Sequence, residues 1–259
     1  MTTIISPDFL TKFATQGTQP LKVVVVGAGG TGSALLGKLF QLHNTLVELS
    51  GNGLSVTVYD DDVVSQSNIG RQAFYPFDLH RPKAQCLVER FNAFGNVNWS
   101  YRNERFDKDS LEHSYNGVVV FGCVDNVAGR KAIHNAFSNT DNCLWVDAGN
   151  DKDSGNVIMG MSARVNKELT YLPSVVDLYK EQIENHVDNN KDSCSALDAI
   201  NKQCFGINDM IASHSIQFLW QLIRYGKVDY QGVSLNLKTG ACAPIHANKE
   251  TWSMYGYVH

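Results

Sequence analysis

The sequence contains few of the residue spacings that build a metal site. It has six cysteines but no C-x-x-C pair, which excludes the usual zinc-ribbon and dithiol redox arrangements. Its eight histidines form no H-x-H or H-x-x-x-H pattern, so we do not expect a metal site built from protein ligands alone. We expect reduced thiols at Cys86, Cys123, Cys143, Cys194, Cys204 and Cys242.

The chain also lacks a long apolar run and an excess of positive charge. Its longest apolar stretches, LKVVVVGAGG and GVVVFGCV, are too short to span a membrane. The N-terminal MTTIISPDFLTKF has neither the cationic lead nor the continuous apolar segment of a signal peptide. The formal net charge of −4 and the pI of about 6.0 leave no basic stripe for nucleic acid. The sequence therefore predicts a cytoplasmic protein with neither a membrane nor a nucleic-acid partner.

The sequence does contain a series of short apolar runs. LKVVVV at 21–26 is rich in β-branched residues and ends at a glycine, which is typical of a strand buried on both faces of a parallel sheet. Segments with helical spacing separate the runs, as in 82–94, where Leu87, Val88 and Phe91 fall on one face. The alternation predicts an α/β fold with a doubly wound, Rossmann-like, mostly parallel sheet. Further strands are predicted at 54–59, 96–101, 117–122 and 143–149.

The length of 259 residues and the hydrophobic content of 43% are sufficient for a sizeable core. We treat 1–259 as a single domain with a nucleotide-binding core over 1–165. The remainder, 166–259, adds C-terminal strands and helices. Its pattern predicts a strand at 155–165, a polar connection at 174–193, an amphipathic helix at 207–226 that ends at a glycine, and a late strand at 232–240.

A glycine-rich turn follows the first of these strands. GAGGTG matches G-x-G-x-x-G and precedes a helix that starts near Thr31. Glycines allow a tight turn and let backbone amides approach a phosphate, whose negative charge a helix N-terminus favours. The motif fits a nicotinamide or flavin dinucleotide as well as ATP, and it can also serve strand–helix packing alone. The expected ligand-binding glycines are Gly27, Gly29, Gly30 and Gly32.

An acidic cluster, DDD, closes the second strand. Asp60 stands where an acidic residue can bind ribose hydroxyls, although it lies 28 residues after Gly32 rather than about 20. We attribute the excess to a loop over HNTLVELSGNG. Arg71 and Lys83 follow as cations, with Asn68 as a polar positioning group. Lys83 is expected in the first turn of a helix that begins at Pro82, where it opposes the helix dipole. An enzyme that breaks a triphosphate needs such cations, whereas a hydride-transfer enzyme does not; solvated surface charges are the alternative.

The run GCVDN ends the fourth strand. An aspartate at the carboxyl end of a strand lies in the crevice where open α/β sheets bind ligands, and Asp125 would suit a magnesium ion shared with phosphates. Asp125 or Asn126 can equally cap the next helix, and the two roles can coexist.

GAGGTG, VYDDDVVSQSNIGRQ, RPKA and CVDNVAGR occur in this order and spacing. Together they resemble the adenylyltransferase superfamily that contains the sulfur-carrier activators ThiF and MoeB and the ubiquitin-activating enzymes. The resemblance covers 20–165 and, more faintly, the chain to about 240. SCSALDAINKQ and VSLNLKTG are also similar to the ThiF-type protein of the PRTRC gene system, which is a narrower match.

The resemblance implies an enzyme that binds ATP and magnesium. It would attach AMP to the C-terminal glycine carboxylate of a ubiquitin-like or sulfur-carrier β-grasp protein and release pyrophosphate. Carried over by motif, Asp60 would hold the ribose, Asn68, Arg71 and Lys83 the phosphates, and Asp125 the metal. Asp62 matches a second acidic position, and Asn126 stands beside Asp125 in the ligand crevice. The resemblance also implies a homodimer.

The sequence departs from the family pattern in two places. No arginine precedes Arg71, so the N-terminal arginine that reaches the partner subunit's site in relatives has only Lys12 and Lys22 as replacements. The zinc site of two C-x-x-C pairs is missing. Cys194, in a similar place to the crossover-loop cysteine of some relatives, is a candidate to take the activated carboxyl as a thioester or persulfide adduct. It can equally be an ordinary packing cysteine, and Cys204, Cys123 and Cys143 are expected in the core.

Two other functions stay open. The glycine loop alone favours an NAD(P)-dependent oxidoreductase, and the missing N-terminal arginine favours a non-catalytic nucleotide-binding module.

Overall fold

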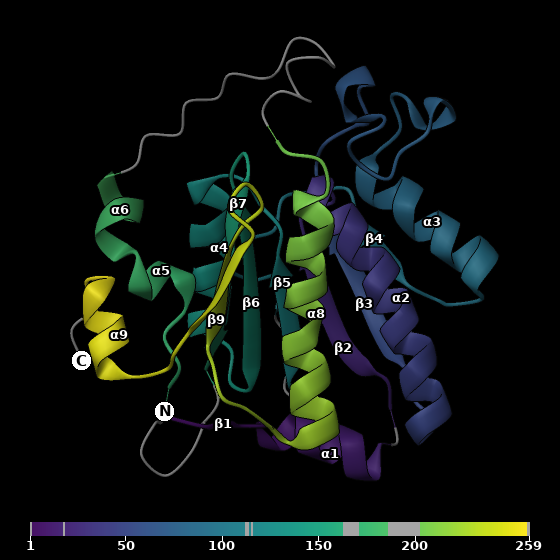
Figure 1. Cartoon of the computed structure of the whole chain (residues 1–259). Helices are drawn as coiled ribbons and strands as arrows, with labels where there is room; N and C mark the ends of the chain where they lie inside the picture. The colour runs from purple at the N-terminus through teal and green to yellow at the C-terminus, as the bar shows by residue number, and fades with distance from the viewer. Residues whose placement is uncertain are drawn as a thin grey trace.

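The computed structural model describes residues 2–17, 19–111, 114, 116–162, 171–185 and 203–257 (Figure 1). No helix within these ranges is long and apolar enough to cross a membrane.

Eight strands form the main sheet, in the order β10-β9-β7-β6-β5-β2-β3-β4. The pairs within β6-β5-β2-β3-β4 are parallel, and β7, β9 and β10 continue the sheet with antiparallel pairs. The prediction of a mostly parallel α/β sheet with extra C-terminal strands is therefore confirmed. The strands of this sheet are β2 (Leu21–Val26), β3 (Leu54–Tyr59), β4 (Ser100–Arg102), β5 (Val118–Gly122), β6 (Cys143–Asn150), β7 (Ser154–Met161), β9 (Gly232–Asn236) and β10 (Ala241–Ile245).

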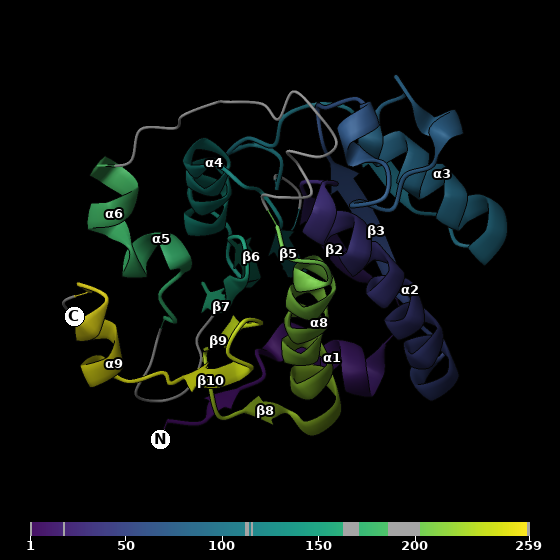
Figure 2. The same cartoon turned by 45° about the horizontal axis from the view of Figure 1, so that its top comes forward.

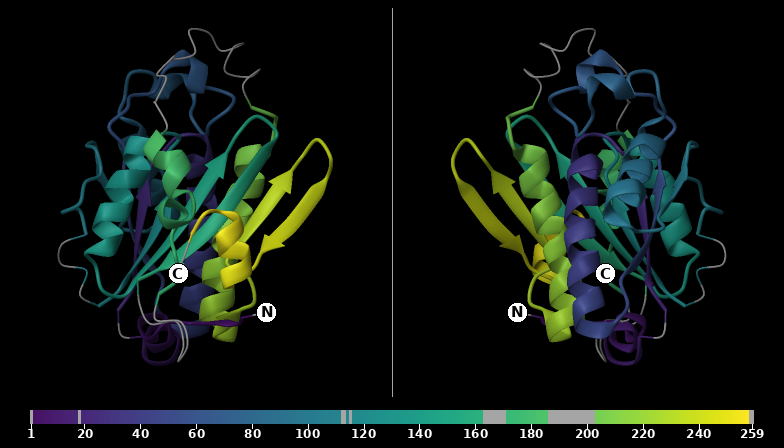
Figure 3. Two further views of the ribbon diagram at one scale, coloured as in Figure 1. Left: turned by 90° about the vertical axis from the view of Figure 1, so that its left-hand side faces the viewer. Right: turned by 90° about the vertical axis from the view of Figure 1, so that its right-hand side faces the viewer.

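Helices cover both faces of this sheet. Helix α8 packs against α2 and against β6 and β7, and α4 contacts β6 and α5. Figure 3 shows α4 and α8 on opposite sides of the strands, and Figure 2 shows β10 at the sheet edge. A separate two-stranded ribbon pairs β1 (Ile4–Ile5) with β8 (Lys227–Val228). The helices are α1 (Asp8–Gln16), α2 (Gly30–Ser50), α3 (Lys83–Gly95), α4 (Val127–Ser138), α5 (Val175–Leu178), α6 (Lys180–Asn185), α8 (Ile207–Tyr225) and α9 (Lys249–Met254), with short 3₁₀ turns η1 (Gln66–Asn68) and η2 (Pro76–Asp78).

The core lies in the central strands and the helix faces that cover them. All five residues of β5 are buried, as are five of the six in β2, because central parallel strands have no solvent-facing side. Leu35, Leu36 and Leu39 of α2 are fully buried. This rigid layer fixes the carboxyl ends of β2, β3 and β5 at one edge of the sheet, where the site lies.

Three predictions about individual elements are wrong. The strand expected at 96–101 begins only at Ser100, because Asn96 takes a left-handed backbone (φ 52°) as the cap of α3. The loop expected at 43–53 is mostly the last two turns of α2, which runs to Ser50. The connection expected at 174–193 contains α5 and α6 in its described part, and a hydrogen bond from the Asp177 amide to the Ser174 hydroxyl caps α5.

Candidate active site

The glycine turn joins β2 to α2 and approaches the end of β5. Gly27 has a φ of +95°, and a Cβ atom there would lie 2.7 Å from the Cys123 carbonyl oxygen. Only glycine fits this backbone and this contact. Gly29 is the residue before α2, and Gly30 and Gly32 belong to the first turn of the helix. The four predicted glycines therefore lie together at a helix N-terminus, an arrangement that favours an anion.

The Asp60 side chain is folded back onto this turn. Its two carboxylate oxygens accept the backbone N–H of Ala28 (2.6 Å) and the backbone N–H of Asp62 (2.9 Å). Burial raises the pKa of Asp60, while the Ala28 amide and the positive charge of Lys83 oppose that rise. The acid predicted to bind ribose thus lies against the glycine turn.

Lys83 and Asp62 form the cation–carboxylate contact of the site. Lys83 is the first residue of α3 and is only 7% exposed, and its Nζ donates to Asp62 Oδ2 over 2.7 Å. Pro82 precedes it as the N-cap, as the sequence predicts. The Asp62 side chain is 66% exposed, so the carboxylate can move away and free the ammonium group.

Arg71 is half-buried and lies within electrostatic reach of Asp125. Burial lowers the pKa of Arg71, and the negative charge of Asp125 opposes this. Its Nη1 donates to Gln203 Oε1 over 2.8 Å, whereas its buried Nε has no hydrogen-bond partner among the described residues. The neighbouring Gln72 likewise has a buried Oε1 without such a partner. A buried donor without an acceptor, such as Arg71 Nε, is uncommon and favours an acceptor-rich ligand, whereas the Gln72 oxygen would need a donor.

Asp125 and Asn126 follow β5. The Asn126 side-chain oxygen accepts the Gly129 N–H over 2.8 Å, so Asn126 caps α4, and Asp125 is exposed. Asn68 is turned inward: its side-chain oxygen accepts the Ser65 N–H over 2.8 Å and closes η1. In this structure Asn68 therefore shapes the turn before Arg71, with its side-chain oxygen bonded to the Ser65 backbone and hydroxyl.

A cavity of about 510 Å³ opens beside Asp125. An ion pair forms part of its lining, with Arg130 Nε 3.1 Å from an oxygen of the buried Asp147. Burial raises the pKa of Asp147, and Arg130 opposes that rise. Other lining residues are Gly149, Asn150, Asp151, Asn156, Tyr179 and Gln182. Asp147 was not predicted as a site residue, although an aspartate inside the apolar run CLWVDAG is a usable signal.

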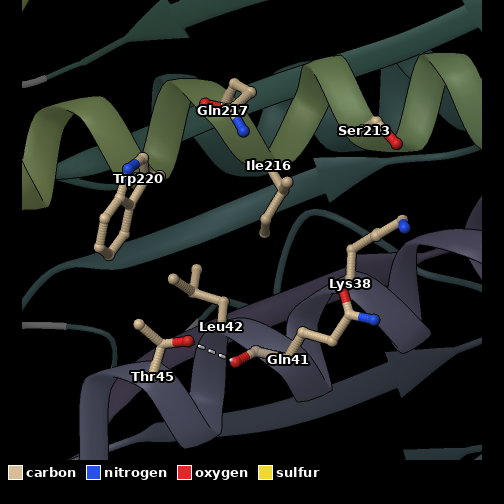
Figure 4. Close-up of a pocket in the computed structure, with 8 residues that line it drawn as sticks. All are labelled: Lys38, Gln41, Leu42, Thr45, Ser213, Ile216, Gln217 and Trp220. Atoms are coloured by element: carbon tan, nitrogen blue, oxygen red, sulfur yellow. Dashed lines mark hydrogen bonds between the residues drawn. The ribbon is translucent and has the colours of Figure 1, made fainter. Parts of the chain in front are cut away.

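A second hollow, of about 330 Å³, lies between α2 and α8 (Figure 4). Its lining residues include Lys38, Gln41, Gln217 and Trp220, and none of the predicted site residues is among them. Figure 4 shows the Thr45 hydroxyl bonded to the Gln41 carbonyl within α2, a contact internal to the helix.

The cysteine predictions have mixed outcomes. Cys194 lies outside the described residues. Cys143 is buried, as expected, but Cys123 is half-buried just beyond β5. Cys204 is exposed and precedes α8, so its expected place inside a helix core is wrong. Cys242, on β10, lies 3.9 Å from His214 Nε2.

Comparisons with known proteins agree with this architecture. The model described as "ThiF family" matches residues 7–250. The sequence matches no curated protein. Among solved structures, the chain is similar to the crystal structure of PaaA, with a TM-score of 0.60 and 16% identity over 92% of this chain and 66% of PaaA. It is also similar to E. coli MccB determined with ATP, with a TM-score of 0.55 and 15% identity over 92% of this chain and 66% of MccB. The aligned part of the chain thus spans 66% of the length of PaaA and of MccB. At 15–16% identity, this similarity shows a shared fold.

Proposed function

The chain belongs to the ThiF family, whose model matches residues 7–250, and from this premise we propose that it is an ATP-dependent adenylyltransferase. Its substrate would be the C-terminal glycine carboxylate of a small ubiquitin-like or sulfur-carrier β-grasp protein. The observation that carries the proposal is the half-buried Arg71 guanidinium, which lies within electrostatic reach of Asp125 and has an Nε without a partner among the described residues. A triphosphate would supply the missing acceptor.

The reaction is a displacement at the α-phosphorus of ATP. A carboxylate oxygen of the carrier forms the new bond to phosphorus, the bond to the bridging oxygen breaks, and pyrophosphate leaves with the electron pair. The protein aligns the reactants and stabilises the developing charge. In this proposal Asp60 binds the ribose hydroxyls, the turn at Gly27 to Gly32 approaches the phosphates, and Arg71 and Lys83 neutralise them.

The residues present fit a magnesium ion bound together with substrate. Magnesium is usually held by one or two carboxylates plus phosphate oxygens rather than by an all-protein cage. Asp125 is an exposed carboxylate opposite Arg71, and no group of three metal-ligating side chains occurs in the described ranges. Asp125 would hold the ion, which supplies charge neutralisation at the phosphates.

The cavity beside Asp125 supports an approach path for the carrier's C-terminal segment. Its lining combines apolar residues with polar ones that include Asn150, Asn156 and Gln182, so an extended peptide backbone would find hydrogen-bond partners there. Figure 1 places α5 and α6, which contribute part of this lining, beside α4.

Three further parts of the hypothesis stay predictions. Cys194 would attack the acyl adenylate to form a thioester, with AMP as the leaving group, or would form an acyl persulfide if a sulfane-sulfur donor had first converted it to a persulfide. The active form would be a homodimer, and the protein would be the ThiF-type member of the PRTRC gene system. The absent N-terminal arginine means that a partner subunit would have to supply a different cation.

The decisive experiment is ATP–pyrophosphate exchange with the cognate carrier protein. We expect exchange with the wild type and a loss of at least 100-fold in Asp125→Ala, because the loss of a preorganised charge in a reaction site typically costs 10²–10³ in rate. Asp141→Ala, which removes an exposed aspartate next to the opposite end of β6, is the matched control and should retain exchange.

Two outcomes would contradict the proposal. Absence of exchange in the wild type, with ATP still bound, would favour a non-catalytic nucleotide-binding module. NADH binding without ATP binding, measured by calorimetry, would favour an oxidoreductase.

A further inference from the structure

Three side-chain amides from two separate parts of the chain meet beside the glycine turn. We call Asn150, Gln203 and Asn208 the carboxamide bridge. Asn150 is the last residue of β6, Asn208 lies in the first turn of α8, and Gln203 lies in the segment that leads to that helix. Asn208 Oδ1 accepts from Asn150 Nδ2 over 3.2 Å, and Asn208 Nδ2 lies 3.4 Å from Gln203 Oε1.

The bridge connects the glycine turn to Arg71. The Thr31 hydroxyl, in the first turn of α2, donates to Asn208 Oδ1 over 3.0 Å. A Cβ atom on Gly30 would lie 2.5 Å from Asn208 Nδ2, so the amide rests directly on the turn. At its other end, Gln203 Oε1 accepts from Arg71 Nη1 over 2.8 Å. A continuous chain of contacts thus runs from Thr31 to the guanidinium group.

Burial makes this network specific. Asn208 is 8% exposed on the buried face of the amphipathic helix α8, where an unsatisfied amide would be costly. Its oxygen and nitrogen both have partners, and fully satisfied buried networks hold their members in one arrangement. Packing alone would favour an apolar residue here, so the amide indicates a positioning role.

The chemistry of the acceptor also matters. A carboxylate hydrogen-bonded to Arg71 in the place of Gln203 would orient the guanidinium, but it would add a second negative charge to that of the nearby Asp125 and repel phosphate. The neutral Gln203 oxygen orients the same group and leaves the charge available. Because Nη1 is held by Gln203 and Nε has no partner in the described part of the chain, the guanidinium has a fixed direction and a free donor.

We propose that the carboxamide bridge positions Arg71 relative to the glycine turn, and that it sets the affinity for the phosphate chain of the nucleotide without affecting the nucleoside part. This proposal rests on the proposed function, because it assumes that ATP occupies the site. Gln203 and Asn208 would be positioning residues, since they act through Arg71 and Thr31.

The test compares binding of ATP and of adenosine by calorimetry in single variants of the full chain. Gln203→Ala removes the acceptor from Arg71, and we expect ATP to bind about tenfold more weakly, the effect of one lost charge-assisted hydrogen bond. Adenosine affinity should stay within twofold, because Asp60 is untouched. Gln217→Ala, on an exposed position of α8, is the matched control and should change neither affinity.

Charged variants provide a readout that a merely structural role would not produce. Gln203→Glu keeps the acceptor and the volume but adds a negative charge, so ATP binding should weaken further than in Gln203→Ala, and 0.5 M salt should reduce the difference. Asn208→Asp keeps the acceptor for Thr31 and places a carboxylate on the glycine turn, so it too should weaken ATP more than adenosine. Pyrophosphate, used as a competitor, should lose affinity in parallel with ATP.

The outcomes separate this inference from the proposed function. If the wild type binds ATP and Gln203→Ala and Gln203→Glu bind it equally well, the positioning role is wrong and the proposed function survives. Equal losses for ATP and adenosine would also overturn the inference, because they indicate general disruption of the site. A wild type that binds no ATP would remove both proposals.

Discussion

At the scale of single residues, two ion pairs close to one another in the sequence have different environments. Asp78 is 1% exposed, and its Oδ2 accepts a hydrogen bond from Arg90 Nη2 over 2.6 Å. Arg81 Nη1 lies 3.8 Å from the other carboxylate oxygen of Asp78. Arg90 also donates to the Ala73 carbonyl over 2.7 Å, so it fixes the segment between Asn68 and α3. In the Lys83–Asp62 pair it is the lysine that is buried, and the carboxylate is open to solvent. The first pair is therefore structural, and the second leaves its cation available for a ligand.

This difference predicts that Arg90→Ala mainly lowers the stability of the protein and that Lys83→Ala mainly lowers its activity. Arg90→Ala leaves the Asp78 carboxylate buried with only a distant cation, and we expect a loss of about 3 kcal/mol in the free energy of unfolding. Lys83→Ala leaves Asp62 in water, so the free energy of unfolding should fall by about 1 kcal/mol or less, whereas the rate of ATP–pyrophosphate exchange should fall strongly. Urea denaturation measures the first effect and ATP–pyrophosphate exchange the second. A Lys83→Ala protein as unstable as Arg90→Ala would show that Lys83 is a structural residue.

At the scale of secondary-structure elements, the sequence predicted the buried elements best. The runs at 21–26, 54–59 and 143–149 became strands with nearly the expected bounds. The first and third are buried along most of their length, which requires mostly apolar residues, and 54–59 alternates buried with less buried residues, as a half-buried strand does. The long amphipathic helix at 207–226 was also confirmed as α8, with Gly226 in a left-handed conformation as its C-cap.

The exposed and edge elements were not predictable in the same way. β10 was not anticipated, since four of its five residues are exposed and its run, ACAPI, carries no alternation between apolar and polar residues. Pro244 removes a backbone donor from this edge strand, which limits pairing with other chains. β1 and β8 have two residues each, and their paired residues, Ile4 with Val228 and Ile5 with Lys227, lie 224 and 222 positions apart in the sequence, so the two strands depend on the tertiary fold.

The turn between β2 and α2 gives a prediction at this scale. Gly27→Ala would place a side chain at φ +95° and 2.7 Å from the Cys123 carbonyl, so β2 and the end of β5 must separate. We expect a loss of about 2–3 kcal/mol in the free energy of unfolding together with loss of ATP binding. Gly37→Ala is the control. Gly37 lies inside α2 and has open space around an added Cβ, so this substitution should be neutral or stabilising. Chemical denaturation and calorimetry on both variants test this; near-wild-type behaviour of Gly27→Ala would refute it.

At the scale of the whole molecule, the sheet gathers residues that are far apart in the sequence. The ends of β2, β3 and β5 carry the glycine turn, Asp60 and Asp125, and this convergence was predicted because parallel strand ends share one edge. The approach of Asn208 to Gly30 was not predicted. It depends on how α8 packs on α2, and neither the period of the helix nor the glycine motif contains that information.

The same arrangement predicts how ligands change the stability of the whole chain. A ligand that binds only the folded state stabilises it by about 2.7 kcal/mol at 100 times its Kd, which corresponds to a rise of roughly 5–10 °C in Tm for a domain of this size. We expect this rise with ATP and magnesium in a thermal-unfolding experiment, and little change with NADH, because Arg71 and Lys83 favour a triphosphate over a nicotinamide. Arg71→Ala should keep the Tm of the unliganded protein close to that of the wild type, since it removes a half-buried charge that makes one side-chain hydrogen bond, to Gln203, among the described residues; yet it should lose most of the ATP-dependent rise. A rise with NADH as large as the rise with ATP would instead assign the glycine turn and Asp60 to a dinucleotide, and the cations to surface charge.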